Sequence, residues 1–258
     1  MTRYGLVLAL MGLPTTAAAV EGPPKAEAAP HEKHVDPEAD RMLRQMTDYL
    51  AALKTFEVTS STVDEVLTND GRKIQITGDQ DVFVSRPSRL RSAQATAANG
   101  LAFADDGKTM TLYCKANNEY ATAPAPATID ATIDTLHKRY QLDAPGADLL
   151  YSRPYEVLTE QVTAGQFIGK ETVDGVLANH LAFQGEEVDW QVWIQAGPQP
   201  LPLRYVITSK TMTDKPEFTV RLSNWQPRAA LADSVFQFQV PVGAKKVASF
   251  PTSCGAAK

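Results

Sequence analysis

The feature that most constrains this chain is a period-two alternation of apolar and polar residues that returns in about ten short segments. In the clearest segment, Val188–Gln195, the even-numbered residues are apolar, so they share one face of a strand. Turn residues such as Asp106-Gly107 and Asp174-Gly175 separate neighbouring segments. The pattern predicts a series of antiparallel hairpins, each with one dry face and one wet face.

Helical spacing is confined to a few segments. Asp36 and Pro37 are typical of an N-cap and a first helical position, and apolar residues then recur every three or four positions up to Leu53. Helices near 38–53 and 129–158 are too few to cover both faces of a broad sheet. We therefore expect an α+β fold, in which a large, strongly curved antiparallel sheet forms an unclosed half-barrel with these helices on its concave face.

The composition excludes several classes of protein. The 258 residues are 43% hydrophobic, which is enough to bury a core and excludes collagen, coiled coils and wholesale disorder. The 25 basic and 30 acidic side chains leave a formal net charge of -5. Because a nucleic-acid-binding surface needs clustered Lys and Arg, we expect no nucleic-acid partner.

The first residues follow the order of a signal peptide: a basic start, a short apolar run and small residues before a cleavage point. We predict that the chain is exported and cut after Ala19. The apolar run is too short to span a membrane, and no later run reaches that length, so we expect no transmembrane segment in the mature chain. The predicted organisation is a signal peptide at 1–19, a flexible leader at 20–35, a single domain at 36–247 and a flexible C-terminal tail at 248–258.

The chain has two cysteines, Cys114 and Cys254. An exported protein meets an oxidising compartment, in which such a pair can form a disulfide. The other interpretation is two unpaired thiols, since Cys254 lies in the small-residue tail. A pair this far apart does not by itself predict a zinc or iron–sulfur site.

No group of polar residues predicts a catalytic or metal site, and we expect no cofactor. His31 and His34 have the spacing of a ligand pair but lie in the leader, where nothing fixes them. Glu186 and Glu187 are typical of the rim of a hairpin turn. The chain carries no nucleophile motif near the histidines at 137 and 180, so we expect no enzyme. A hydrolase whose site is assembled from distant segments stays as an alternative.

The aromatic residues of the strands carry the main binding hypothesis. Their ordinary role is to fill a core. The functional interpretation is that a set of strand residues lines a cavity for an acyl chain or a similar apolar ligand, with three arginines near a strand end meeting an anionic head group. The predicted cavity residues are Phe83, Phe183, Trp190, Val192, Phe218 and Leu222, and the predicted head-group contacts are Arg86, Arg89 and Arg91.

Several segments resemble known families. The helix end Leu50–Phe56, the strand end Val84–Arg91 and the hairpin Ala104–Tyr113 resemble the LolA/LolB-like periplasmic carriers. Tyr120–Pro126, Asp189–Ile194 and Leu201–Arg204 are similar to a bacterial family of predicted periplasmic proteins of unknown function. The resemblance covers about 36–247. It implies a periplasmic protein with an unclosed barrel and an apolar interior, which accepts acyl chains in the carriers and senses envelope ligands in the RseB-like proteins.

The sequence therefore leads to one main hypothesis and two alternatives. The main hypothesis is a periplasmic binding protein, without catalysis, for a lipid, an acyl chain, or a lipidated or otherwise hydrophobic partner. The first alternative is a protein-interaction or stress-sensing module of the envelope, with a packed interior and envelope proteins as its partners. The second is the hydrolase described above.

Overall fold

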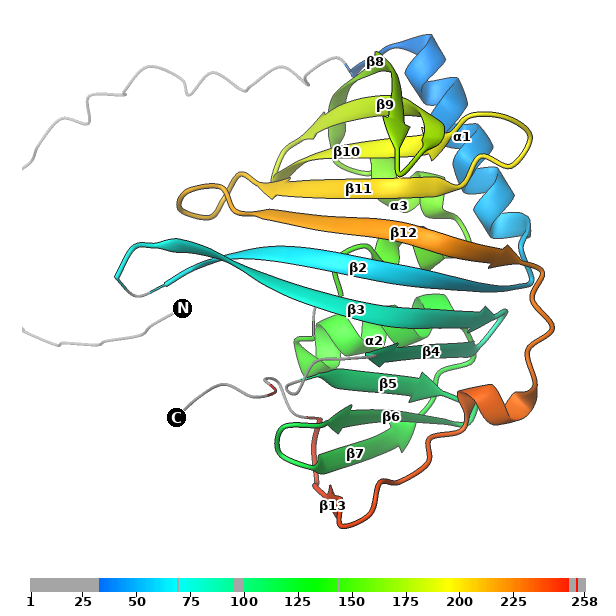
Figure 1. The fold of residues 1–258 in the computed structure, drawn as a ribbon, viewed down its shortest axis with the longest axis vertical. Coiled ribbons are helices and arrows are strands. Elements are labelled where there is room, and N and C mark those ends of the chain that lie inside the picture. Colours follow the sequence, from blue (N-terminus) through cyan, green and yellow to red (C-terminus); the bar gives the residue numbers. More distant parts are fainter. Residues whose placement is uncertain (1–32, 69, 95–99, 143, 251–253, 255–258) are drawn as a thin grey trace, which may run out of the picture. The chain divides into compact units, whose positions relative to one another are not determined.

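The computed structural model describes residues 33–68, 70–94, 100–142, 144–250 and 254. The predicted signal peptide and all but the last residues of the predicted leader lie outside these residues. The described strands form one 13-stranded sheet (Figure 1). In spatial order they are β1 (His34–Val35), β8 (Val162–Val173), β9 (Val176–Gly185), β10 (Val188–Gln195), β11 (Pro202–Ser209), β12 (Glu217–Pro227), β2 (Thr55–Leu67), β3 (Lys73–Ser85), β4 (Arg89–Gln94), β5 (Leu101–Asp105), β6 (Thr109–Cys114), β7 (Glu119–Pro124) and β13 (Lys245–Lys246).

The sheet is unclosed, because β1 and β13 stand at its two ends and do not pair with each other. All the pairs between the longer strands are antiparallel, as the hairpin pattern predicts. The two short edge strands instead pair in parallel, β1 with β8 and β13 with β7. The predicted fold class is confirmed, with a mixed sheet in place of a wholly antiparallel one.

Two longer helices and three short ones accompany the sheet: α1 (Pro37–Ala52), α2 (Ile129–Tyr140), η1 (Ala147–Leu150), α3 (Pro154–Thr159) and η2 (Asp233–Phe236). The predicted start of α1 is confirmed, because the Asp36 carboxylate accepts a hydrogen bond of 2.8 Å from the Glu38 N–H. Thr128 caps α2 in the same way, accepting from the Ala131 N–H at 3.1 Å. Both caps satisfy backbone donors that a helix start leaves unpaired.

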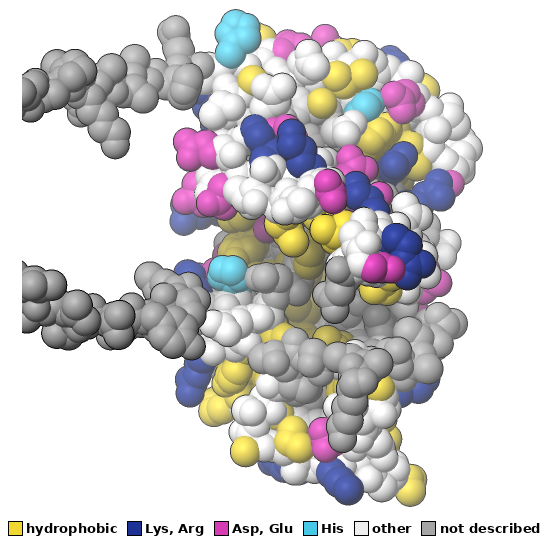
Figure 2. Space-filling model, turned by 90° about the vertical axis from the view of Figure 1, so that its left-hand side faces the viewer, with side chains coloured by type: hydrophobic (Ala, Val, Ile, Leu, Met, Phe, Trp, Pro, Cys, Tyr) yellow, Lys and Arg dark blue, Asp and Glu magenta, His cyan; other side chains and the backbone are white. Residues whose placement is uncertain are grey.

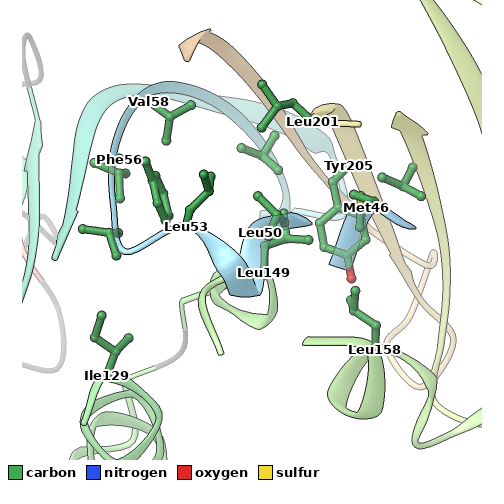
Figure 3. Close-up of a cluster of buried hydrophobic side chains, with 14 of the residues drawn as sticks. Met46, Leu50, Leu53, Phe56, Val58, Ile129, Leu149, Leu158, Leu201 and Tyr205 are labelled. Carbon is green, nitrogen blue, oxygen red and sulfur yellow. The ribbon is translucent and has the colours of Figure 1, made fainter. Parts of the chain in front are cut away.

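The concave face of the sheet carries the main core. The apolar stripe of α1, which includes Leu43, Met46 and Leu50, is buried against it (Figure 3). Ile129 of α2, Leu149 of η1 and Leu158 of α3 join the same cluster. Each such side chain contributes roughly 1.5–3 kcal/mol when it is fully buried. The helices therefore hold the sheet by filling its concave face.

The hairpin of β2 and β3 extends beyond this helical layer. Its two strands pair without a register shift from Thr55↔Ser85 to Leu67↔Lys73. Val82 and Val84 on β3 are buried, whereas Ile74 and Ile76, which lie on the same face by alternation, are exposed. The outer half of the hairpin thus carries apolar residues on a part of the concave face that the described helices leave open.

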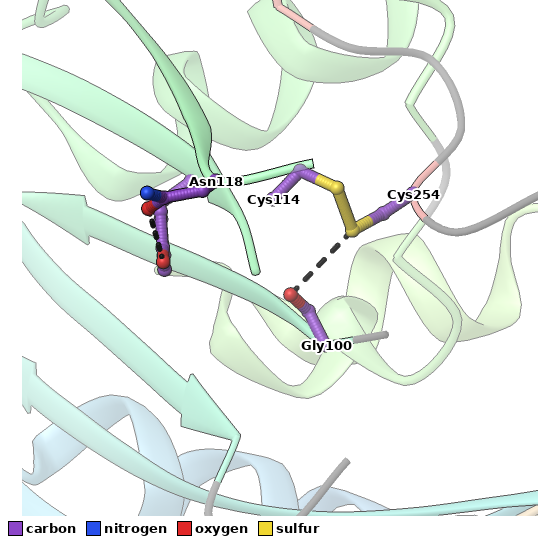
Figure 4. Close-up of a disulfide and its surroundings, with 5 residues drawn as sticks. Gly100, Cys114, Asn118 and Cys254 are labelled. Atoms are coloured by element: carbon purple, nitrogen blue, oxygen red, sulfur yellow. Dashed lines mark hydrogen bonds between the residues drawn. A yellow bond between two sulfur atoms is a disulfide. The ribbon is translucent and has the colours of Figure 1, made fainter. Parts of the chain in front are cut away.

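A disulfide fixes the end of the chain. Cys114 on β6 and Cys254 are joined across a sequence separation of 140 residues, so the disulfide interpretation is confirmed over that of two free thiols (Figure 4). Phe250 is only 4% exposed, and its ring lies 4.5 Å from that of Tyr140 on α2. The Phe250 side chain therefore packs against the domain inside the segment predicted as a tail from residue 248.

We predict that replacing both cysteines, Cys114→Ser with Cys254→Ser, lowers the free energy of unfolding by about 2–4 kcal/mol, because the cross-link restricts the unfolded chain. Urea denaturation of the oxidised protein and of the double variant measures the difference. The single variant Cys254→Ser should lose as much free energy of unfolding as the double variant. Equal midpoints for the oxidised protein and the double variant would show that the bond contributes nothing to stability.

Candidate functional site

A row of side chains crosses the concave face from β8 to β3, and we call it the concave row. Each member is the cross-strand partner of the next. Exposure rises along the row: Trp190 is 4% exposed, Ile207 and Phe218 are half-buried, and Ile76 is 53% exposed. The members are Gly165, Phe183, Trp190, Ile207, Phe218, Asp64 and Ile76.

The inner end of the concave row is closely packed. The Phe183 and Trp190 rings stack at 4.1 Å, and the Tyr205 ring meets the Trp190 ring edge-on at 5.8 Å. The Phe183 ring also covers Gly165, where a Cβ would lie 2.6 Å from Phe183 Cε1. Glycine is therefore required at position 165 by this close approach.

Five of the six predicted cavity residues belong to one hydrophobic cluster. The five are Phe183, Trp190, Val192, Phe218 and Leu222. Phe83 is not brought together with them. It lies between Val82 and Val84, whose buried side chains point to the concave face, so alternation places Phe83 on the convex face of β3. The alternation along a strand shows which residues share a face. It does not show whether the odd-numbered or the even-numbered residues face the helices.

The outer end of the concave row is open. Ile74 lies on the same face as Ile76 near the end of the β2–β3 hairpin and is 42% exposed, whereas Leu67, the cross-strand partner of Lys73, lies on the convex face. Figure 2 looks at the molecule from the side of the hairpin tips and shows a hollow with hydrophobic side chains on its walls. The concave face is thus dry and filled at one end of the row and uncovered at the other.

The pocket beside the inner end of the concave row is small. A pocket of about 120 Å³, which we call the inner pocket, lies between α3 and the strands β9 to β11. A cavity of about 150 Å³ holds one benzene molecule, and sites for drug-sized ligands have about 300–1,000 Å³, so the inner pocket has no room for a whole acyl chain. The apolar lining is Val157, Leu158, Val162, Val188 and Trp190, and the polar lining includes Asp148, Glu160 and Tyr205.

Two polar groups of the inner pocket lack hydrogen-bond partners in the described part of the chain. Tyr205 is 3% exposed, and its hydroxyl points from β11 toward Leu158 on α3 (Figure 3). Asp148 of η1 is half-buried. Burial raises the pKa of the Asp148 carboxyl; burial and then the charge of Asp148 raise the pKa of Tyr205 well above its usual value. Sequence reasoning missed Asp148, although an acid inside the apolar segment Ala147–Leu150 is the signal that marks it.

The structure does not bring the three predicted head-group arginines to the concave row. Arg86 donates to the carbonyl oxygens of Leu150 and Tyr151, at 2.8 and 3.3 Å, and so ties the end of β3 to η1. Burial lowers the pKa of its guanidinium, and nearby Asp130 partly offsets that effect. A guanidinium with five donors suits this task, because backbone carbonyls inside a protein need partners.

The other two arginines hold the segment around η2. Arg89 forms an ion pair with Asp233, donates to Ser85 Oγ at 2.9 Å and lies over the Phe236 ring. Arg91 donates to the Val235 carbonyl at 2.8 Å. All three guanidinium groups therefore bind groups of the protein itself, and their placement gives the head-group hypothesis no support.

A separate polar cluster lies on the convex face. His180 and Trp193 are cross-strand partners whose rings stack at 4.0 Å, and Arg204 lies over Trp193. The Glu171 carboxylate accepts from Trp193 Nε1 at 2.8 Å and lies 2.9 Å from His180 Nδ1. The Trp193 hydrogen bond, and then that of His180, lowers the pKa of the Glu171 carboxyl. The cluster joins β8 to β11, and none of its members touches the concave row.

The other residues that the sequence analysis considered for a catalytic or metal site lie at the following positions. Glu186 and Glu187 form the turn between β9 and β10, as expected. His34 lies on β1, while His31 is outside the described residues. In the described ranges no group of three or more His, Cys, Asp or Glu side chains is placed to hold a metal ion. None of the described helices has the length and apolarity needed to cross a membrane.

Comparison with protein families decides the family. The model of the predicted periplasmic proteins called DUF2092 matches residues 39–249. The chain belongs to the DUF2092 family. The predicted family is thereby confirmed, and its members are described as predicted periplasmic proteins. No curated protein matches the sequence of this DUF2092 member.

Three solved structures resemble this chain over most of its length. The Mycobacterium tuberculosis lipoprotein LppX is 15% identical, with a TM-score of 0.46 over 74% of this chain and 96% of that chain. A LolA superfamily protein from Nitrosomonas europaea is 11% identical, with a TM-score of 0.41 over 78% and 97%. A chain of the Pseudomonas aeruginosa MucA/MucB complex is 14% identical, with a TM-score of 0.45 over 78% and 61%. Each is a similarity of fold at low sequence identity.

We predict that Gly165→Ala lowers the free energy of unfolding by about 1–3 kcal/mol, because the new Cβ collides with the Phe183 ring. Urea denaturation measures the loss. The double variant Gly165→Ala with Phe183→Leu should lose less than the sum of the two single variants, since the smaller side chain makes room. Additive losses would show that the ring does not impose the glycine.

We predict that Asp148→Asn stabilises the protein at neutral pH but not in acid. Because burial raises the pKa of Asp148, the folded state holds this proton more tightly, and the free energy of unfolding falls as the pH rises above the ordinary Asp pKa of about 3.9. Urea denaturation at pH 3.5 and pH 7 compares the two proteins. Glu187→Gln, on the exposed β9–β10 turn, is the control. A variant less stable than the wild type at pH 7 would contradict the prediction.

Proposed function

We propose that this protein binds the acyl chain of a lipid or of a lipidated protein in the bacterial envelope, without catalysing a reaction. The chain lies along the open half of the concave row, from Ile207 past Phe218 to Ile76. The predicted signal peptide and the description of the DUF2092 family as periplasmic support the envelope as the place of action.

One observation carries this proposal: the apolar concave face continues past the helices that cover it. On β3 the even-numbered residues are apolar again at Ile76 and Ile74, beyond Gln80 and Gly78, where the face is exposed, while Lys73 and Gln75 point to the other face. A sheet face in water is ordinarily polar. Contiguous exposed apolar residues on such a face are typical of a binding surface.

The size of the open surface suits one acyl chain. The row from Ile207 to Ile76 crosses the strands β11, β12, β2 and β3, which is about 14 Å at the usual spacing between strands. Each methylene group that leaves water for this surface contributes about 0.8 kcal/mol. Asp64 is the one charged side chain on the row, and burial raises the pKa of its carboxyl. The surface therefore favours ligands without an anionic group at this end.

The small inner pocket favours a second candidate, an interaction module with a packed interior. In that case the exposed Ile74 and Ile76 would be covered by an apolar segment of a partner protein. In the first candidate function an acyl chain covers this surface, and in the second a segment of a partner protein covers it. A lipid without protein distinguishes them, because only the first candidate predicts that it binds.

We predict that Ile76→Asn weakens binding of a neutral fluorescent monoacylglycerol about tenfold, because a polar amide replaces the apolar contact at the open end of the row. Titration of the purified protein, followed by probe fluorescence, measures the dissociation constant. Ile168→Asn is the matched control, since Ile168 on β8 is 47% exposed but lies off the row. No saturable binding to the wild type, or equal weakening by both variants, would refute the proposed function.

A further inference from the structure

We propose that the inner pocket binds a primary ammonium group, which the Asp148 carboxylate and the Tyr205 hydroxyl receive at the buried end of the concave row. The ligand class is an amine, either free or as the head group of an acyl-chain ligand. If the amine is the head group of an acyl-chain ligand, the proposal rests on the proposed function and specifies the ligand of that function. It assigns the head group to a place that none of Arg86, Arg89 and Arg91 occupies.

The polar groups of the pocket are unsatisfied. The Tyr205 side chain is 3% exposed, and its hydroxyl has no hydrogen bond to the described residues. Asp148 faces the same pocket and has no hydrogen bond to the described residues. Two unsatisfied groups that converge on one hollow are typical of a site that a ligand completes.

The charges around the pocket select a cation. Asp148 and Glu160 both line it. The nearby ammonium groups are already used: Lys33 donates to the Thr159 carbonyl at 3.0 Å, and Lys210 donates to the Gly185 carbonyl at 2.8 Å. No basic side chain of the described ranges neutralises Asp148. An anionic ligand would meet these carboxylates, whereas an ammonium group pairs with one of them by a charge-assisted hydrogen bond.

The volume limits the size of the group. About 120 Å³ is close to the space that holds one benzene molecule, so an aminoethyl group fits and a sugar does not. An ammonium group donates up to three hydrogen bonds, and the Asp148 carboxylate and the Tyr205 oxygen supply acceptors for it. The phenol can in turn donate to an oxygen on the next carbon atoms of the ligand.

Trp190 connects the pocket to the concave row. It lines the pocket and is the cross-strand partner of Ile207, the next member of the row. A ligand with its ammonium group at Asp148 therefore leaves the pocket over apolar residues, toward Phe218 and Ile76. The proposal therefore places the chain of such a ligand along the concave row.

Isothermal titration calorimetry of the purified protein with dodecylamine, dodecanol and ethanolamine tests the proposal. We expect dodecylamine to bind about tenfold more tightly than dodecanol, and Asp148→Asn to bring the ratio of the two dissociation constants close to one. Tyr205→Phe should also weaken the binding of dodecylamine. Glu187→Gln, an exposed acid outside the pocket, is the matched control and should keep the preference.

The outcomes separate the sources of the amine and the two proposals. If ethanolamine binds and Asp148→Asn abolishes this binding, the ligand of the pocket is a free amine and the ammonium site is supported. If dodecanol does not bind in that case, only the proposed acyl-chain function fails. Equal affinities for dodecylamine and dodecanol, with no effect of Asp148→Asn, would overturn the ammonium site, and the pocket would then hold only water. No binding of any of the three compounds would overturn both.

Discussion

The structure depends on the mismatch between a wide sheet and the few helices that cover it. A sheet of 13 strands needs apolar cover along its whole concave face, and α1, α2, η1 and α3 supply it over part of that face. Where they lie, the side chains pack into the main cluster, and the inner pocket lies between α3 and the strands. Where they end, Ile74 and Ile76 stay apolar and exposed. The proposed binding surface is the part of the sheet that the helices do not reach.

Much of the fold follows from local pattern. Alternation located the hairpins, Asp36-Pro37 located the start of α1, and the ratio of strands to helices predicted the unclosed sheet. Two features of the fold could not be predicted from local sequence pattern. Pairing of the short edge strands and docking of Phe250 depend on segments far apart in the sequence, and no local period records such contacts.

The candidate site was predictable in its apolar part alone. Phe183, Trp190 and Phe218 share a face because strand alternation has a fixed period, whereas Phe83 has the same character and lies on the other face. The polar part depends on pairing in space. The arginines looked available because their partners, such as Asp233 and the carbonyls near residue 150, are distant in the chain, and Asp148 looked ordinary because its isolation appears only in the folded protein.

The most direct test of the account is native mass spectrometry of the protein purified gently from the periplasm of the cells that produce it. The account predicts a complex whose extra mass corresponds to one molecule with an acyl chain, released on collisional activation. It also predicts that protein stripped of this molecule takes up one equivalent of an added lipid. The mass of the polypeptide alone, together with no uptake of added lipid, would contradict the claim that the uncovered concave face is a lipid-binding surface.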